Sequence, residues 1–219
     1  MKPLKNIKLI ILDLDGVVVD TMPDLAVAVQ KTGEAMGCGH ISAKEAGSHV
    51  GRGAKKGLGG LLGPERAHLL DKAQDYFRTY YSEHCADRSL LYTGVRDVLE
   101  HFRGRMKIAM ATAKIRPATE NILEKLGVLQ YFDMIVTADD MQRMKPDPQC
   151  IEIILDSLGV KADEAVMVGD MKTDIQAGKA AGTATIAVTY GYGKPKDLES
   201  SDPDILIDNF FELKDVVCL

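Results

Sequence analysis

Short apolar runs alternate with longer amphipathic segments along most of the chain. The run from Leu9 to Leu12 is continuously apolar, which predicts a strand buried on both faces. The segments that predict further strands are 106–111, 133–137, 164–168, 184–188 and 205–207, and those that predict helices are 94–103, 117–126, 148–158, 173–181 and 210–217. Strands that alternate with helices in this way indicate an α/β fold with a doubly wound parallel sheet.

The segment between the first two of these strands has a different pattern. From Pro23 to about Asp87 the apolar positions recur at helical spacing, most extensively from 65 to 85, and no convincing strand pattern occurs there. Glycine-rich breaks separate the helical stretches. We therefore expect a small α-helical domain, residues 18–90, inserted into an α/β core that comprises residues 1–17 and 91–219.

Composition narrows the class of protein. The chain is 46% hydrophobic and 27% charged, as in a globular protein, and its net charge of −5 argues against a nucleic-acid partner, which needs a basic surface. Its four cysteines lie far apart without a C-x-x-C pair, which indicates reduced thiols rather than disulfides or a zinc site. No apolar stretch reaches the roughly 18 residues of a membrane span. We expect a cytoplasmic monomer or homodimer without a membrane partner.

The first predicted strand ends in two aspartates. Asp13 and Asp15 are two residues apart, and side chains at that spacing on extended backbone point to the same side. Carboxylates this close repel one another unless a cation lies between them, and Mg²⁺ binds through one or two carboxylates together with a substrate phosphate. The stretch therefore indicates metal-assisted phosphoryl transfer. The alternative is a strand that ends in a polar turn, with the aspartates and Gly16 as ordinary turn residues.

Polar residues also follow later strands of the predicted sheet, and ligands of such sheets bind outside the carboxyl ends of the strands. Thr112 follows strand 106–111, Asp170 follows strand 164–168 with Asp174 four residues later, and Lys145 lies in a loop between a strand and a helix. Each has an ordinary structural alternative: a helix cap for the threonine, a solvated lysine, and acids of a first helical turn. Together they predict one polar site at one edge of the sheet.

These residues also give the chain a resemblance to a known family. The chain resembles the haloacid dehalogenase-like (HAD) superfamily over essentially its whole length, with the motifs at 13–16, 112, 145 and 169–174, and its helical insert resembles that family's small cap domain. Within the superfamily it is most similar to phosphoglycolate phosphatases, and this closer resemblance lies in the segments 50–54, 189–193 and 203–208. It departs from the usual pattern at Val17, where threonine is usual, and at Ala113, where asparagine is common.

The resemblance implies catalytic roles for the first three motifs. Asp13 would attack phosphorus and form an aspartyl-phosphate, and Asp15 would act first as general acid and then as general base, with Gly16 in support. Thr112 and Lys145 would hold phosphoryl oxygens, because stabilising charge on the transferring group is the main task in phosphoryl transfer.

The resemblance also implies a metal and its ligands. Mg²⁺ would bind the carboxylate of Asp13, the backbone carbonyl of Asp15 and the carboxylate of Asp170, and it would bridge to a phosphate oxygen. Asp174 would support this set by orienting Lys145 or a metal-bound water.

The inserted segment is expected to decide the substrate. Residues 18–90 carry as many acidic as basic side chains, so an anionic substrate needs a local positive group. Arg52, between two glycines, is the candidate for gripping a substrate carboxylate, and Ala113 is expected beside the substrate. The alternative for Arg52 is an exposed side chain on a flexible loop.

Three functions are compatible with these residues. The first is a Mg²⁺-dependent phosphatase that hydrolyses a small anionic phosphomonoester, with 2-phosphoglycolate as the preferred substrate. The second is another HAD enzyme, namely an inorganic pyrophosphatase, a sugar-phosphate phosphatase or a phosphosugar mutase. The third is a non-catalytic phosphoester-binding protein, which the intact set of charged motif residues disfavours, because a scaffold has no physical need to concentrate those charges.

Overall fold

The chain divides into two compact units. The computed structural model describes residues 3–50 and 53–218. One unit comprises Met1–Asp20 and Leu91–Leu219, and the other is Thr21–Leu90.

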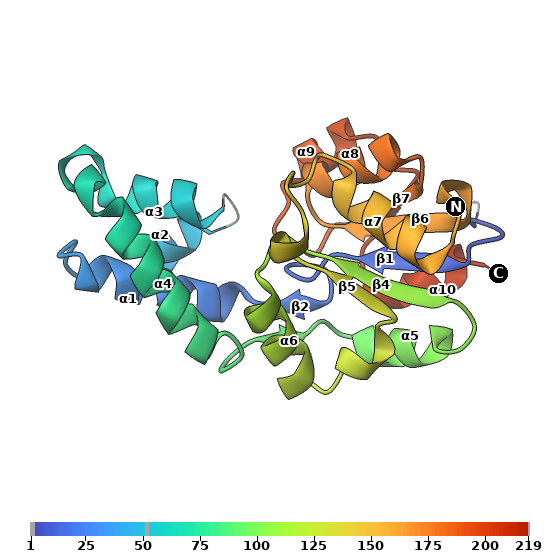
Figure 1. Cartoon of the computed structure of the whole chain (residues 1–219), viewed down its shortest axis with the longest axis horizontal. Coiled ribbons are helices and arrows are strands. Elements are labelled where there is room, and N and C mark those ends of the chain that lie inside the picture. Colours follow the sequence, from blue (N-terminus) through green and yellow to red (C-terminus); the bar gives the residue numbers. More distant parts are fainter. Residues whose placement is uncertain (1–2, 51–52, 219) are drawn as a thin grey trace. The chain divides into compact units, whose positions relative to one another are not determined.

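The discontinuous unit is built on a six-stranded parallel sheet with the order β5-β4-β1-β6-β7-β8 (Figure 1). The strands are β1 (Leu9–Leu12), β4 (Lys107–Ala111), β5 (Met134–Val136), β6 (Ala165–Gly169), β7 (Ala184–Val188) and β8 (Ile205–Ile207). Strand β1 lies between β4 and β6, and the strand order runs outward from it in both directions. This is the switch point of a doubly wound sheet, beside which ligands bind in such folds. The predicted fold class is confirmed.

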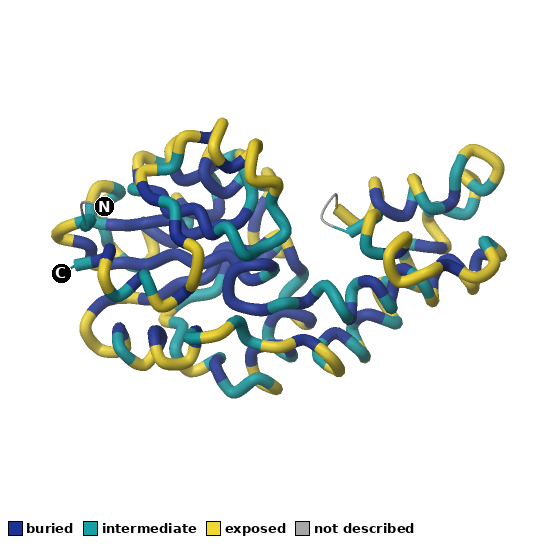
Figure 2. The backbone as a smooth tube through the Cα atoms, turned by 180° about the vertical axis from the view of Figure 1, so that it is seen from behind, coloured by how far each residue is buried: buried dark blue, intermediate teal, exposed yellow. Residues whose placement is uncertain are grey.

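Helices cover both faces of this sheet, with α7, α8 and α9 on one face and α5, α6 and α10 on the other (Figure 1). Their bounds are α5 (Val95–Phe102), α6 (Arg116–Lys125), α7 (Gln149–Leu158), α8 (Lys172–Ala181), α9 (Pro195–Ser200) and α10 (Leu213–Val216). Short 3-10 helices are η2 (Leu129–Tyr131), η3 (Ala138–Asp140), η4 (Ala162–Glu164) and η5 (Phe210–Glu212). All four residues of β1 are buried, as Figure 2 shows, which confirms burial on both faces.

The register of the central strands brings their carboxyl ends to one level. Leu12, the last residue of β1, lies opposite Met110 of β4 and Val168 of β6. On one face, Leu9 and Ile11 belong to a buried cluster that also contains residues of α7 and α8. The three strand ends that precede the predicted polar residues are therefore neighbours on a rigid support.

The second unit is helical. It contains α1 (Met22–Ala35), α2 (Ala43–Ser48), α3 (Ala54–Leu62), η1 (Pro64–Leu69) and α4 (Leu70–His84). Two buried clusters hold it together, one around Val29 and Ile41 and one around Leu58 and Leu62, and the half-buried Phe77 packs against both. The unit thus has an apolar core of its own.

Three details differ from the predicted pattern. Strands β2 (Val19–Asp20) and β3 (Leu90–Leu91) form a two-stranded sheet that the pattern does not predict, on either side of the stretch 23–87 in which no strand is expected. The helix expected over 65–85 begins as the 3-10 helix η1, and the one expected over 210–217 begins as η5. Helix α9 was not predicted. Two-residue strands show no alternation, and α9 buries only Leu198, so neither has a period that sequence can reveal.

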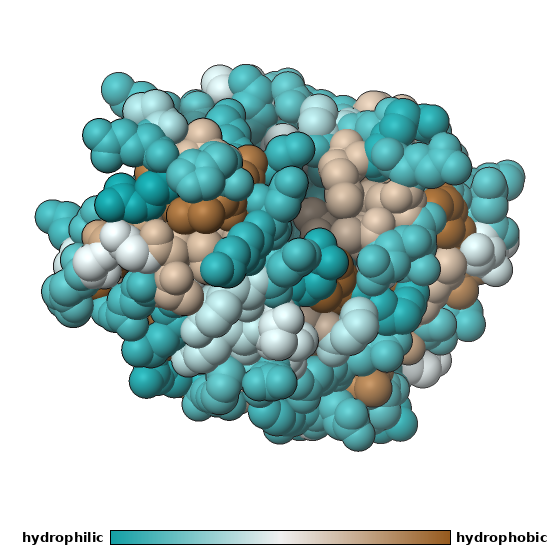
Figure 3. Space-filling model, turned by 60° about the vertical axis from the view of Figure 1, so that its left-hand side comes forward, coloured by the Kyte–Doolittle hydropathy of each residue, from teal (hydrophilic) through white to brown (hydrophobic). Residues whose placement is uncertain are grey.

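The surface is mostly polar. On the face that Figure 3 shows, hydrophilic residues cover most of the area. The exposed large apolar side chains among the described residues are Tyr76, Leu90, Met144 and Phe211. Within residues 3–50 and 53–218, no helix combines the length and the apolar character that crossing a membrane requires.

Candidate active site

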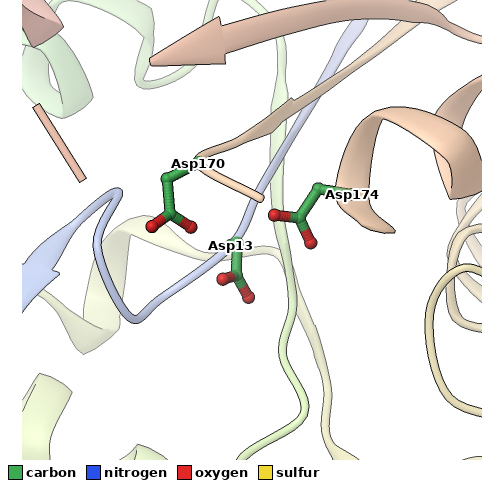
Figure 4. A group of neighbouring side chains, drawn as sticks. All are labelled: Asp13, Asp170 and Asp174. Carbon is green, nitrogen blue, oxygen red and sulfur yellow. The ribbon is translucent and has the colours of Figure 1, made fainter. Parts of the chain in front are cut away.

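Three aspartates meet at the carboxyl edge of the sheet. Asp13 directly follows β1, Asp170 directly follows β6, and Asp174 lies in the first turn of α8. All three are buried, and one carboxylate oxygen of each lies within 4.8 Å of the others (Figure 4). Because like charges at such distances repel, this cluster requires positive charge close by.

One lysine supplies part of that charge. The ammonium of Lys145, whose side chain is 6% exposed, lies 2.9 Å from Asp13 Oδ1 and 2.6 Å from Asp174 Oδ1. It also donates a hydrogen bond to the carbonyl of Ala111 at the end of β4 (3.0 Å). The solvated-lysine alternative is therefore wrong. A single ammonium cannot neutralise three carboxylates, so the cluster keeps an excess of negative charge.

The pKa values of the ionisable groups in this cluster are shifted by burial and by their neighbours' charges. Burial raises the pKa of Asp13 to about 7, with Lys145 opposing the change and Asp174 adding to it. Burial, and then the charges of Asp13 and Asp174, raise the pKa of Asp170 to about 8. Burial alone would lower the pKa of Lys145, but the neighbouring carboxylates raise it above its ordinary value, so the lysine carries its charge. Perturbed carboxyls in a polar cluster at a strand edge are typical of functional sites.

A glycine-rich loop cradles Asp170. The backbone N–H of Tyr192 donates to Asp170 Oδ2 (2.6 Å), while Oδ1 is buried and has no hydrogen-bond partner among the described residues. A Cβ at Gly191 or Gly193 would overlap Asp170, and a Cβ at Gly16, where φ is +83°, would overlap its Oδ2. These three positions therefore need glycine, and the packing holds Asp170 with one oxygen unused.

Asp15 and Thr112 lie beside this cluster but have other partners. Asp15 Oδ1 lies 3.2 Å from Lys114 Nζ, and among the described residues Asp15 is not part of the three-carboxylate group. Thr112, which is 1% exposed, accepts a hydrogen bond at Oγ1 from the backbone N–H of Lys114 (3.2 Å). The helix-cap alternative for Thr112 is wrong, because the N-cap residue of α6 is Ile115.

Residues 10–188 match the model of the family described as haloacid dehalogenase-like hydrolase. The chain belongs to this family. The matched range begins in β1 and ends with β7, so it contains every strand that contributes to the aspartate cluster and the whole helical unit. The protein is accordingly a hydrolase of the haloacid dehalogenase-like family.

Curated relatives match the chain over almost its full length. The chain is 34% identical over 223 residues, 98% of each chain, to a phosphoglycolate phosphatase from Vibrio parahaemolyticus. It is 33% identical over 227 residues to a phosphoglycolate phosphatase from Photobacterium profundum, covering 100% of this chain and 99% of the relative. A crystal structure of a predicted phosphoglycolate phosphatase from Haemophilus somnus matches the fold with a TM-score of 0.87 at 24% identity, covering 97% and 99% of the two chains.

Most of the predicted site residues lie together at the carboxyl edge of the sheet. Two positions that were predicted to bind the substrate, Arg52 and Ala113, are not among the described members of this cluster. The structure joins Lys145 to Asp13 and Asp174 through direct contacts and brings Asp170 into the same carboxylate cluster. It places Asp15, Gly16 and Thr112 beside them. Ala113 is exposed. Arg52 lies outside the described residues.

The acids that gather with Asp13 are Asp170 and Asp174, whereas the alternation of side chains along a strand predicts that Asp13 and Asp15 share a cation. Strand β1 ends at Leu12, and the chain turns through the left-handed Gly16, so the alternation of a strand does not extend to Asp15.

Two further residues of the site escaped the sequence reasoning. Lys114 follows Thr112 by two residues, and its position close to the end of a predicted strand is the feature of the sequence that could have identified it. Tyr192 was noted only as part of the similar segment 189–193, and its hydrogen bond spans 22 residues to reach Asp170. No local pattern predicts that contact.

Proposed function

We propose that this haloacid dehalogenase-like hydrolase is a Mg²⁺-dependent phosphatase that hydrolyses a small anionic phosphomonoester, 2-phosphoglycolate by preference. The observation that carries the proposal is the buried Asp13 at the end of the central strand, held by Lys145 beside Asp170, whose Oδ1 has no partner among the described residues. The names of the curated relatives support the choice of substrate.

The residues of the cluster fit a hard divalent cation. The available donors are all oxygens, which Mg²⁺ prefers, and Asp170 offers a buried oxygen that needs a partner. Burial, together with repulsion from the neighbouring carboxylates, raises the pKa values of Asp13 and Asp170, and a cation held between them would lower both. In the proposal Asp13, Asp170 and the backbone carbonyl of Asp15 hold the ion, with Asp174 in support. When bound, the ion screens the charge between carboxylate and phosphate and favours the ionised form of Asp13.

In the first half of the proposed reaction, the Asp13 carboxylate attacks phosphorus. A bond forms between a carboxylate oxygen and phosphorus while the bond to the ester oxygen breaks, and the ester oxygen leaves with the electron pair. Asp15 transfers a proton to that oxygen, so an alcohol departs. Lys145 and Thr112 stabilise the charge on the phosphoryl oxygens during the transfer.

In the second half, water attacks phosphorus of the aspartyl-phosphate. Asp15, now ionised, accepts a proton from this water, and the bond from phosphorus to the Asp13 oxygen breaks with its electrons returning to the carboxylate. Inorganic phosphate leaves and both aspartates regain their starting states. Lys145 remains protonated throughout, because its neighbouring carboxylates raise its pKa.

Metal binding should depend on pH in a defined direction. In the metal-free protein Asp13 and Asp170 have pKa values of about 7 and about 8, above the ordinary 3.8. Between about pH 4 and pH 8 the folded chain therefore holds protons that the unfolded chain has lost, and stability falls as pH rises. Mg²⁺ displaces these protons, so we expect it to raise the Tm more near pH 8 than near pH 6. Thermal unfolding with and without Mg²⁺ measures this, and Asp170→Asn should abolish the shift. An equal shift at both pH values would contradict the expectation.

The substrate is tested by phosphate release across a panel in Mg²⁺. The panel contains 2-phosphoglycolate, inorganic pyrophosphate, several sugar phosphates and 4-nitrophenyl phosphate. We expect 2-phosphoglycolate to have the highest kcat/KM, by about tenfold or more, and chelation of the metal to stop turnover. A leading sugar phosphate or pyrophosphate would refute the substrate proposal alone. Failure to hydrolyse any member with any divalent metal would refute the phosphatase.

We also propose a cytoplasmic location and a role for the helical unit Thr21–Leu90 as a substrate-selecting cap. The location is supported by the cysteines, because none of the four is in a disulfide within the described residues. The cap role is supported by the insertion of this unit between β1 and β4, which together carry Asp13 and Thr112 at their ends.

A further inference from the structure

A second lysine beside the site has no role in the reaction described so far. Lys114 lies three residues beyond the end of β4, and its side chain is 6% exposed. Its backbone N–H donates to Thr112 Oγ1 (3.2 Å), and its carbonyl accepts from the N–H of Ala138 (3.0 Å). The backbone from which this ammonium extends is therefore fixed on both sides.

The two buried lysines of the site are divided between different acids. Lys145 contacts Asp13 and Asp174, whereas Lys114 lies 3.2 Å from Asp15, whose side chain is 27% exposed. Burying an ammonium is costly unless a charged or polar group compensates it. Asp15 compensates the charge of the Lys114 ammonium, and the ion pair at the same time fixes the carboxyl group of Asp15 beside the aspartate cluster.

We propose that Lys114 is a positioning residue that holds the carboxyl group of Asp15 where it delivers its proton to the departing oxygen. The inference rests on the proposed function, in which Asp15 is the general acid. Proton transfer needs the acid within about 2.6–3.2 Å of the oxygen that receives the proton. Asp15 lies beyond the end of β1, where an isolated bridge pairs its backbone with Val19. The direction of its carboxyl group depends on side-chain contacts, and the ion pair to Lys114 supplies one.

The consequence is specific to the leaving group. When an alkyl phosphate transfers its phosphoryl group to Asp13, the departing alkoxide is a strong base and needs the proton of Asp15 as the bond breaks. 4-Nitrophenolate is stable without protonation, so its departure depends much less on the acid. The ratio kcat/KM covers the steps up to departure of this group and excludes hydrolysis of the aspartyl-phosphate. It therefore reports only the proton-donating half of the role of Asp15.

The test compares Lys114→Met and Lys114→Gln with the wild-type enzyme on three phosphomonoesters. These are 2-phosphoglycolate, the monophosphate of ethylene glycol, which is an alkyl phosphate without a carboxylate, and 4-nitrophenyl phosphate. We expect Lys114→Met to lower kcat/KM for both alkyl phosphates about 10²-fold, at the lower end of the contribution of a positioned general acid. For 4-nitrophenyl phosphate the loss should be less than about threefold, and Lys114→Gln should lie between Lys114→Met and wild type.

Lys107→Met serves as the matched control, because it removes a surface ion pair of similar length, 3.3 Å to Asp133, from the other end of β4. It should leave all three substrates unchanged. An equal loss on all three substrates in the Lys114 variants would overturn the proposal in favour of a structural role. A loss confined to 2-phosphoglycolate would overturn it in favour of a contact with the substrate carboxylate. Both results leave the phosphatase itself intact, whereas a wild-type enzyme inactive on every substrate refutes the proposed function.

Discussion

Asp13→Asn should abolish turnover of every phosphomonoester, with kcat falling about 10⁴-fold or more. Asparagine has the shape of aspartate, but its amide is a poor nucleophile and carries no charge for a cation. The fold should persist, because Lys145 keeps its contact with Asp174 and the replacement removes one charge from a cluster of three carboxylates. Phosphate release under saturating substrate and Mg²⁺ measures the loss.

The control for this change is Asp163→Asn, which alters an exposed aspartate just before β6 and should leave kcat unchanged. Circular dichroism and thermal unfolding show whether the Asp13 variant is folded. A folded Asp13→Asn variant with near wild-type turnover would refute the assignment of Asp13 as the nucleophile, whatever the substrate.

Lys145→Met should have the second largest effect, on activity and on stability together. The ammonium of Lys145 stabilises the charge on the phosphoryl oxygens in the proposed reaction. Its loss should lower kcat/KM about 10³-fold, which is the size of effect seen when an enzyme loses a preorganised hydrogen-bond donor to a developing charge. The variant also leaves the buried carboxylates of Asp13 and Asp174 without their ammonium, and breaking a buried ion pair from one side costs about 3–5 kcal/mol. We expect the loss of unfolding free energy to be smaller near pH 5, where the raised pKa values let Asp13 and Asp170 take up protons.

Urea unfolding at two pH values and steady-state kinetics measure these effects. Lys196→Met, at an exposed position of α9, is the control and should change neither quantity. A fall in kcat/KM of less than tenfold would mean that Lys145 does not act on the transferring group. An unchanged unfolding free energy would mean that the carboxylates do not depend on its charge.

The sheet was predictable because its strands are mostly buried and mostly apolar. The bounds of β1, β7 and β8 agree with those of the apolar runs, because polar or charged residues stand on either side of each strand. The ribbon of β2 and β3 has two residues in each strand, and a segment so short carries no period. Its pairing depends on residues about 70 positions apart in the chain, which local patterns do not report.

The site was predictable in its location but not in the pairing of its side chains. The order of strand ends places Asp13, Thr112 and Asp170 at the same edge, because parallel strands share one carboxyl edge. The partition of the two lysines between different carboxylates depends on loop conformations that no periodicity encodes. The glycines that cradle Asp170 likewise act through packing between segments distant in sequence.

The central claim is that phosphoryl transfer passes through Asp13, and trapping the covalent intermediate tests it most directly. Wild-type enzyme is mixed with radiolabelled phosphomonoester and Mg²⁺, quenched in acid within the first turnover, and digested so that the labelled peptide can be identified by mass. The account predicts a labelled acyl phosphate on the peptide that contains Asp13, at up to one phosphoryl group per chain, and none in Asp13→Asn. Turnover without any label on the protein, or label on another residue, would contradict it.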